Sequence, residues 1–285
     1  MSKFFMINGE ILPEAEAFLK PTDIGFRRGY AAFDFLRIYQ GSPLFIDDHL
    51  ARFYRSAERL GLEMPLNITD YKERLLELIK RTQLHESGLQ MFLTGGDSPD
   101  GFNPATPNLI VILVPLPQNK PEAFSEGVKL ISHNYQRDLP EAKSNNYFMA
   151  VNLSKRIRDE GAKDVLYYHD DKVLETTRSN IFMVTEGGTL VTAKEGVLHG
   201  VTRKHLLNVA RDYLKVEERD INLEEFGRAK EVFLSGTTLG AMPVRQIDER
   251  IIGDGKPGPV TLELTIRFKK HVEAYLAQHS LFNPA

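Results

Sequence analysis

Two apolar runs in the middle of the chain flank a polar turn that opens with a carboxylate: Val173-Leu174-Glu175-Thr176-Thr177-Arg178-Ser179-Asn180-Ile181-Phe182. The pattern predicts strands over residues 173–175 and 180–184, with hydroxyl and amide groups between them. Further strands are predicted over residues 165–169 and 189–192, because Asp170-Asp171 and Gly187-Gly188 are hairpin signals. Taken alone, the polar run fits either a functional site or an ordinary hydrogen-bonded turn.

The first part of the chain opens with a hairpin signal and continues with helical and strand patterns. Asn8-Gly9 predicts a type I′ turn between two short strands within Phe4 to Leu12. Apolar residues at helical spacing predict a helix that Asp47 caps and Gly61 ends, and a second helix from about Thr69. Two strands then flank a loop long enough to be functional; the strands are residues 89–93 and 109–114, and the loop is 95–108.

A proline-rich connection divides the chain into two predicted domains. The 285 residues exceed what one compact core usually holds, and three prolines between residues 115 and 121 interrupt regular structure. We expect a small α/β domain over residues 1–116, a linker over 117–123 and a larger mixed β domain over 124–285. The larger domain should add helices and a strand; the helices are about 147–160, 202–214 and 261–277, and the strand is 231–235. This mixed order indicates an α/β or α+β fold.

The composition excludes several classes of function. The chain has 36 Lys and Arg against 39 Asp and Glu, so a net charge of −3 leaves no positive excess for generic nucleic-acid binding. It has no cysteine, which removes disulfides and thiolate chemistry and fits a reducing compartment. The longest apolar run, Leu109 to Val114, has six residues, so we expect no membrane span or signal peptide and a cytoplasmic location. The eight histidines lack ligand spacing, and we expect no metal site.

Three further segments carry polar groups that suit an anionic ligand or a reactive amine. Lys143 lies at the start of a predicted helix among small polar residues. It can be interpreted either as a reactive amine or as a solvated side chain. Thr202 is a suitable helix cap, yet Arg203 and Lys204 follow it where the helix dipole favours acids. An anion bound at the exposed amides would relieve this conflict, and solvation would also explain it. The turn Ser235-Gly236-Thr237-Thr238 is of a type that cradles phosphate.

An ordered set of motifs covers almost the whole chain. After a strand pattern from Gly29 to Arg37, the motifs are HxxR at 49–52, K-x-x-N-Y at 143–147, E-x-x-x-x-N-[IV]-F at 175–182, G-[IV]-T-R at 200–203, S-G-T-T at 235–238 and G-x-G-x-x-G-P-x-T at 253–261. In this order they resemble the fold type IV family of pyridoxal phosphate enzymes, which contains branched-chain aminotransferases, D-amino acid aminotransferases and aminodeoxychorismate lyases. The resemblance implies a two-domain fold type IV enzyme with pyridoxal 5′-phosphate as its cofactor.

The resemblance implies two catalytic residues. Lys143 is similar to the family lysine that bonds to the cofactor and moves a proton at the substrate carbon. Glu175 is similar to the carboxylate that faces the pyridine nitrogen and keeps the cofactor ring an electron sink. Tyr147 and Asn180 match positions with supporting roles.

The resemblance also implies a phosphate site built from separate segments. Arg52 would supply a charge-assisted pair, and the backbone amides of Val201 and Thr202 would supply a helix N-terminus. The hydroxyl of Thr237 would complete the site.

The substrate site departs from both aminotransferase patterns. An Arg-x-His pair binds the substrate carboxylate in D-amino acid aminotransferases of the well-known bacterial type, and residues 96–102 lack it. Branched-chain enzymes normally have a glycine where Phe35 stands, so that pocket is altered too. We expect Arg28 and Arg178 to supply a replacement carboxylate site, because guanidinium groups suit carboxylates. Interface ion pairing for Arg28 and phosphate support for Arg178 are the alternatives, and the motifs place Phe33 and Thr238 at further substrate positions.

These features predict a transaminase for amino acids and 2-oxo acids. The preferred hypothesis is a D-amino acid aminotransferase with an atypical carboxylate site and 2-oxoglutarate as a plausible acceptor. A branched-chain L-aminotransferase, an aminodeoxychorismate lyase and a non-catalytic dimeric binding protein are the alternatives. The resemblance also implies a homodimer, because active sites in the family draw on two subunits.

Overall fold

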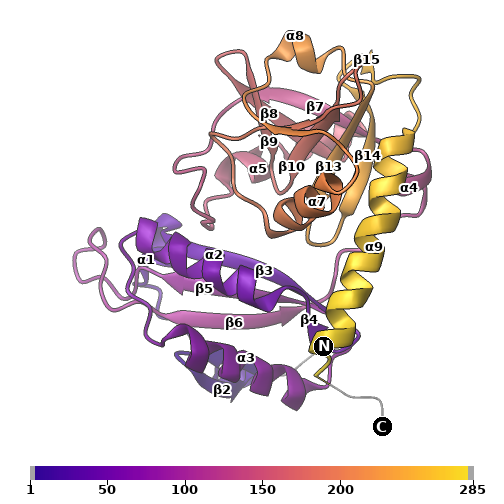
Figure 1. Ribbon diagram of the computed structural model, residues 1–285. Helices are drawn as coiled ribbons and strands as arrows, with labels where there is room; N and C mark the ends of the chain where they lie inside the picture. The colour runs from indigo at the N-terminus through magenta and orange to yellow at the C-terminus, as the bar shows by residue number, and fades with distance from the viewer. Residues whose placement is uncertain (1–3, 282–285) are drawn as a thin grey trace. The chain divides into compact units, whose positions relative to one another are not determined.

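The computed structural model describes residues 4–281 and divides into two compact units (Figure 1). The first unit contains the chain up to Pro117, the short segment Ala142–Asn146 and the chain from Ala274 onward. The second unit contains Gln118–Glu141 and Tyr147–Glu273. Lys143 therefore belongs to the first unit, whereas the strands around Glu175 belong to the second.

The first unit is built on an antiparallel sheet in which the strand order is β2-β1-β6-β5-β3-β4. Its strands are β1 (Phe4–Ile7), β2 (Glu10–Pro13), β3 (Ala31–Tyr39), β4 (Ser42–Pro43), β5 (Ser87–Thr94) and β6 (Leu109–Val114). The predicted hairpin is confirmed: Asn8 and Gly9 join β1 to β2 with φ of 52° and 87°, which a type I′ turn requires. The predicted strands 89–93 and 109–114 are β5 and β6.

Two long helices cover one face of this sheet. They are α2 (Ile46–Arg59) and α3 (Ile68–Thr82), preceded by a 3₁₀ turn (Glu14–Glu16) and α1 (Ile24–Arg28). The core joins Leu50 of α2 and Leu75 of α3 to alternate residues of β3, β5 and β6. The expectation that Asp47 caps α2 is wrong, because the helix begins at Ile46 after Phe45, which has a left-handed φ of 55°.

The second unit contains a sheet in which the strand order is β12-β11-β10-β13-β14-β7-β8-β9, with β15 paired to β14. Its strands are β7 (Val128–Asn134), β8 (Asp164–His169), β9 (Lys172–Thr176), β10 (Asn180–Val184), β11 (Leu190–Thr192), β12 (Val216–Glu218), β13 (Glu231–Gly236), β14 (Gly240–Ile247) and β15 (Arg250–Ile251). A further pairing of Glu175 with Asn180 closes the path from β10 through β13, β14, β7 and β8 to β9 into a ring. The closing pair thus contains two residues of the polar motif.

Helices surround this ring and complete the chain (Figure 1). They are α4 (Glu122–Ser125), α5 (Phe148–Asn152), α6 (Ser154–Asp159), α7 (Val201–Arg211), α8 (Leu223–Phe226) and α9 (Pro259–His279). The single helix expected at about 147–160 is wrong, because α5 and α6 are separate helices with Leu153 between them. Within residues 4–281, none of the helices is both long enough and apolar enough to cross a membrane.

Candidate active site

The segment that carries Lys143 extends the edge of β3 in the first unit. The backbone N–H of Phe33 donates to the carbonyl oxygen of Lys143 at 2.8 Å, and that of Asn145 donates to the carbonyl oxygen of Ala31 at 3.1 Å. Lys143 is partly buried, and its Nζ lies 5.1 Å from the centre of the Phe33 ring. The sheet therefore fixes the main chain of Lys143 and brings its amine to Phe33, two of the predicted site residues.

Arg52 is held by a buried ion pair that the sequence did not reveal. Asp34, which points from β3 into the core and is fully buried, accepts from Arg52 Nε at 2.8 Å and from Arg52 Nη2 at 2.7 Å. Burial alone would raise the pKa of Asp34, but the charge and hydrogen bonds of Arg52, together with His49, hold it well below its usual range. Arg52 thus has a fixed orientation, with its Nη1 outside this pair.

His49 completes the cluster and is held in one tautomer. Its Nδ1 lies 2.8 Å from an oxygen of Asp34 and 3.2 Å from Arg52 Nη2. Because ionised Asp34 can only accept, Nδ1 carries the proton and donates to Asp34, and the approach of Arg52 is a contact between two donors. Burial lowers the pKa of His49 against the opposing attraction of Asp34. The histidine of the HxxR motif therefore serves to orient Asp34.

Glu175 lies at the end of β9 in the second unit, where donors from three residues converge on its carboxylate. Arg137 donates to Oε1 from Nε at 2.8 Å and pairs with it through Nη2 at 2.7 Å. The backbone N–H of Leu198 donates to Oε2 at 3.0 Å, and Asn180 Nδ2 approaches Oε2 at 3.5 Å. Glu175 is only 5% exposed, so the position of its carboxylate is set by these donors and by the closing strand pair.

A second buried acid stabilises the turn after Glu175 by accepting a hydrogen bond from it. Asp164, the first residue of β8, accepts from the hydroxyl of Thr177 at 2.6 Å and from its neighbour Val165 N at 2.7 Å. Burial raises the pKa of Asp164, although these hydrogen bonds oppose the shift. Arg178, at the next position of the turn, is exposed and makes no hydrogen bond or ion pair with residues 4–281.

The start of α7 offers backbone amides to an anion. Its N-cap is Gly200, which provides no side chain to accept from the first amides, so the expectation that Thr202 caps this helix is wrong. A Cβ on Gly200 would lie 2.3 Å from Asn180 Oδ1, which explains why the position needs glycine. The charge conflict predicted in the first turn is partly resolved by Arg203, whose Nη2 pairs with Glu218 at 2.9 Å.

The S-G-T-T motif lies where β13 turns into β14. Thr237 and Thr238 are partly buried in this turn, and the carbonyl oxygen of Thr238 accepts from Asn119 Nδ2 at 3.2 Å. The hydroxyl of Ser235 is buried without a hydrogen-bond partner among residues 4–281. Val201, Thr202, Thr237 and Glu175 thus all belong to the second unit.

Arg28 lies at the end of α1 in the first unit. It is exposed, and its Nε donates to the carbonyl oxygen of Gly101 at 3.1 Å, so it braces the long loop predicted to be functional. Asp23 anchors the same region, because it is buried and accepts from Thr94 Oγ1 at 2.6 Å and Asn108 Nδ2 at 2.8 Å. Arg28 and Arg178 belong to different units.

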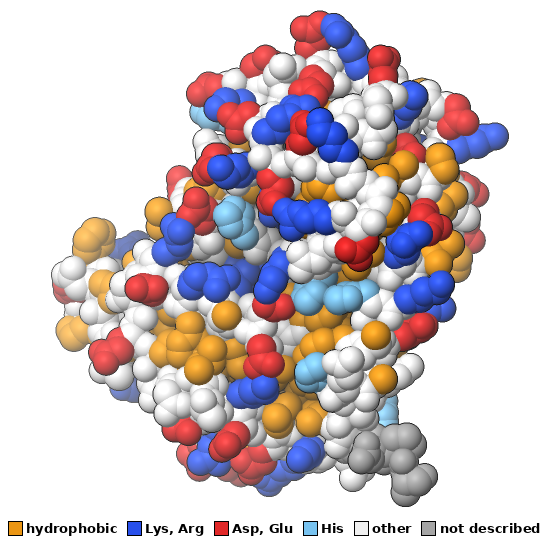
Figure 2. Space-filling model, in the orientation of Figure 1, with side chains coloured by type: hydrophobic (Ala, Val, Ile, Leu, Met, Phe, Trp, Pro, Cys, Tyr) orange, Lys and Arg blue, Asp and Glu red, His pale blue; other side chains and the backbone are white. Residues whose placement is uncertain are grey.

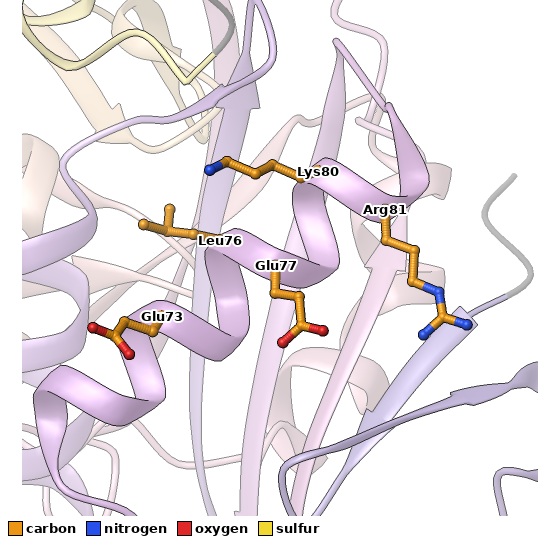
Figure 3. A pocket seen from close by; sticks show the side chains of 5 residues that line it. All are labelled: Glu73, Leu76, Glu77, Lys80 and Arg81. Carbon is orange, nitrogen blue, oxygen red and sulfur yellow. The ribbon is translucent and has the colours of Figure 1, made fainter.

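A surface hollow on α3 contains none of the predicted site residues. A hollow on the exposed side of α3 is lined by groups of both charges and one leucine (Figure 3): Glu73, Leu76, Glu77, Lys80 and Arg81. Glu77 already pairs with Arg74 at 3.2 Å, and the guanidinium of Arg81 lies 4.6 Å from the centre of the Phe4 ring. Among residues 4–281, no three His, Asp or Glu side chains lie together in a way that could hold a metal ion.

Sequence reasoning missed three residues of the site: Asp34, Arg137 and Asp164. Asp34 has a signal, because it is a lone carboxylate at an inward position of a strand that otherwise buries apolar side chains. Arg137 lies outside every motif, and no sequence signal pointed to it. Asp164 could have been suspected as an acid that opens a buried strand.

Comparisons with known proteins identify the family. The family model described as amino-transferase class IV matches residues 31–247. The chain is 30% identical over 264 residues to a D-alanine aminotransferase of Bacillus licheniformis, covering 90% of this chain and 92% of that protein. It is 29% identical over 276 residues to a putative branched-chain-amino-acid aminotransferase of Methanocaldococcus jannaschii, covering 92% and 94%.

Solved structures agree on the fold. The branched-chain amino acid aminotransferase of Escherichia coli superposes with a TM-score of 0.88 at 24% identity, covering 95% of this chain and 94% of that one. The family model spans most of the chain, including the motifs that contain Lys143 and Glu175, and the predicted fold type IV architecture is confirmed. The chain therefore belongs to the class IV aminotransferases.

Proposed function

We propose that this aminotransferase exchanges the amino group of a D-amino acid with a 2-oxo acid such as 2-oxoglutarate. The observation that carries the proposal is the exposed guanidinium of Arg178, which directly follows the Glu175 turn and is engaged by no hydrogen bond within residues 4–281. The likeness to a D-alanine aminotransferase over 90% of the chain supports the same substrate class. An exposed guanidinium beside the Glu175 motif suits the carboxylate that every amino acid substrate carries.

Pyridoxal 5′-phosphate is the cofactor of class IV aminotransferases, and the residues present fit it. The phosphate requires cations and N–H donors, which the buried guanidinium of Arg52 and the uncapped start of α7 at Val201 and Thr202 supply. The Thr237 hydroxyl is a further candidate ligand. When bound, the cofactor supplies the electron-withdrawing ring that amino transfer needs.

The chain's own side chains would perform the remaining steps. Lys143 would hold the cofactor covalently through its amine and move a proton to and from the α-carbon of the substrate. Glu175, oriented by Arg137, would hold a proton at the pyridine nitrogen. Arg52 would bind the phosphate while Asp34 keeps its guanidinium oriented.

The substrate carboxylate would be bound by Arg178 and by Arg28. Arg28 already donates to Gly101 through Nε, which leaves its two terminal nitrogens for a fork-shaped contact. Phe33 and Thr238 would contact the rest of the substrate, and the ring of Phe33 is already beside Lys143. We therefore retain these four residues as the proposed substrate site.

A half-reaction screen tests the proposal. The absorbance of the loaded enzyme should change on addition of D-amino acids singly, and 2-oxoglutarate should reverse the change. Arg178→Ala should raise the substrate concentration for half-maximal change about tenfold, the equivalent of about 1.4 kcal/mol, with cofactor retained. Arg158→Ala is the matched control, since Arg158 is another exposed arginine of the second unit. A response confined to L-amino acids, or equal behaviour of both variants, would refute the assignment.

A branched-chain L-aminotransferase is the second candidate. It is favoured by the 29% identity to the putative branched-chain enzyme of Methanocaldococcus jannaschii. The same screen with L-leucine, L-isoleucine and L-valine distinguishes it, because this candidate requires a response to L-amino acids and the first requires one to D-amino acids. An aminodeoxychorismate lyase would instead release pyruvate without any 2-oxo acid acceptor.

We also propose that the chain acts as a homodimer in the cytoplasm. Exposed phenyl rings support an interface between copies in the first unit: Phe18 is 78% exposed, and Phe26 and Phe102 are each 77% exposed. Hydrophobic side chains reach the surface at the left edge of Figure 2, where Figure 1 shows the loop between β5 and β6. Light scattering on the purified protein measures the oligomeric state directly. The absence of cysteine agrees with a reducing compartment.

A further inference from the structure

One buried hydroxyl joins the helix of Arg52 to the segment of Lys143. Ser56 lies on α2 and is 1% exposed. Its Oγ accepts from the backbone N–H of Lys143 at 3.0 Å and donates to the carbonyl oxygen of Arg52 at 2.9 Å. A serine hydroxyl has one donor and two acceptor lone pairs, so both contacts can be made at once.

We propose that Ser56 is a positioning residue for Lys143, because its hydroxyl fixes the main chain that carries the amine against the turn of α2 that carries Arg52. The inference rests on the proposed roles of Lys143 and Arg52 in holding the cofactor. Ser56 itself touches neither the amine nor the guanidinium. It acts through two backbone groups, one from each residue.

The main chain of Lys143 is held from two sides. Its carbonyl oxygen accepts from Phe33 N of β3 at 2.8 Å, and its N–H donates to Ser56 of α2. The bond from Ser56 back to the carbonyl four residues earlier fixes the serine rotamer and directs a lone pair at Lys143. The direction in which the lysine side chain leaves the backbone is therefore determined by both the sheet and the helix.

Removing the hydroxyl would release one side of this arrangement. The Lys143 N–H would lose its acceptor, while the bonds of the neighbouring backbone to β3 would remain. A shift of about 1 Å in a reacting group can lower a rate about 100-fold. The expected loss is therefore in the rate of the chemical step rather than in binding of the substrate.

A matched control separates positioning from simple helix stability. Thr82 on α3 donates to the carbonyl oxygen of Leu78, four residues earlier, at 3.0 Å, just as Ser56 donates to Arg52. It accepts no hydrogen bond from another segment within residues 4–281. Thr82→Ala thus deletes the same kind of helix hydroxyl without touching Lys143.

The experiment compares Ser56→Ala, Ser56→Thr and Thr82→Ala with the wild type. Hydrogen exchange resolved at single amides, with and without cofactor, should be at least about tenfold faster at Lys143 in Ser56→Ala, because that amide loses its acceptor. Exchange at Asn145, which donates to Ala31, should change less. In steady-state assays kcat should fall about 10- to 100-fold with KM nearly unchanged. Ser56→Thr, which keeps the hydroxyl, should restore both properties.

Two outcomes distinguish this inference from the proposed function. Borohydride reduction of the loaded wild type should attach the cofactor to Lys143, as mass spectrometry of peptides would show. Attachment elsewhere would overturn the proposed function and this inference with it. Attachment at Lys143 with wild-type exchange and kcat in Ser56→Ala would overturn the positioning role alone, as would an equal loss of kcat in Thr82→Ala.

Discussion

Replacing Asp34 with alanine should strongly destabilise the cofactor-free protein. Asp34 is fully buried and accepts two hydrogen bonds from Arg52 and one from His49. Removing the Asp34 carboxylate leaves the guanidinium of Arg52 without its counter-ion and the Nδ1–H of His49 without its acceptor. Arg52 is only 6% exposed, so water cannot readily replace the lost partner. The Asp34→Ala variant therefore breaks a buried ion pair from one side.

The expected loss in the free energy of unfolding follows from this burial. Deleting one partner of a buried pair costs about 3–5 kcal/mol, because the other charge remains desolvated. Exposed pairs contribute only about 0–1 kcal/mol. Glu77→Ala is the matched control, since Glu77 and Arg74 form a pair at 3.2 Å in which both side chains are 54% exposed. The two variants remove the same kind of charge pair and differ in burial.

Urea unfolding of the cofactor-free variants at pH 7 and at lower pH measures the effect. The pKa of Asp34 is lower in the folded chain than in the unfolded chain, so its contribution is fully present above the unfolded pKa of about 3.9 and decreases as the pH falls below it. The difference between wild type and Asp34→Ala should therefore shrink as the pH falls below about 4. A loss at pH 7 no larger than that of Glu77→Ala, or one that does not depend on pH, would refute the reasoning.

Three further outcomes are expected. Glu175→Gln should lower kcat far more than it lowers cofactor retention, measured by steady-state assay and absorbance, and equal losses would contradict its place at the pyridine nitrogen. Burial raises the pKa of Asp164, so its negative charge opposes folding once the pH rises above the pKa that Asp164 has in the unfolded chain. Asp164→Asn keeps an acceptor for Thr177 and should therefore leave the thermal stability at pH 8 unchanged or higher. A large loss of thermal stability in this variant would disprove the reasoning. Gly200→Ala should weaken cofactor binding in a direct titration, because the added Cβ would lie 2.3 Å from Asn180 Oδ1, and unaltered affinity would show that the start of α7 is not a phosphate site.

Local sequence signals predicted elements well where the backbone itself imposes a constraint. Asn8-Gly9 marks its hairpin because both residues must adopt positive φ. The cap residues were harder to predict, since Asp47 and Thr202 are good caps by type but each is the second residue of its helix. Chain geometry at Phe45 and Gly200 decides where those helices begin, and a residue-type preference does not contain that information.

Strands that lack a sharp signal were missed. β7 and β14 were not predicted, and both lie inside the ring of the second unit. One pairing joins distant parts of the chain, since β14 pairs with β7 in parallel at Val244 and Val128. Such pairing depends on the assembled sheet rather than on the local pattern.

The candidate site could be predicted where its residues form sequence motifs. It could not be predicted where an ion-pair partner lies outside every motif. The G-[IV]-T-R and HxxR motifs indicated an anion site, but nothing local paired Arg52 with Asp34, which lies 18 residues earlier on a strand. Arg137 is likewise distant from Glu175 in sequence. The roles of Lys143, Glu175 and the two substrate arginines stay predictions until the experiments above are done.

The first unit is assembled from separate segments of the chain, and this affects how the protein can fold during its synthesis. Its β3 edge is covered by residues 142–146, and Ser42 Oγ accepts from the backbone N–H of Leu281 at 2.9 Å. A ribosome that has released only the first 117 residues has therefore released a sheet whose open edge lacks its covering segment. The β3 edge can reach its native packing only after residues 142–146 have been translated, so until then the nascent chain has an open strand edge at which it can aggregate.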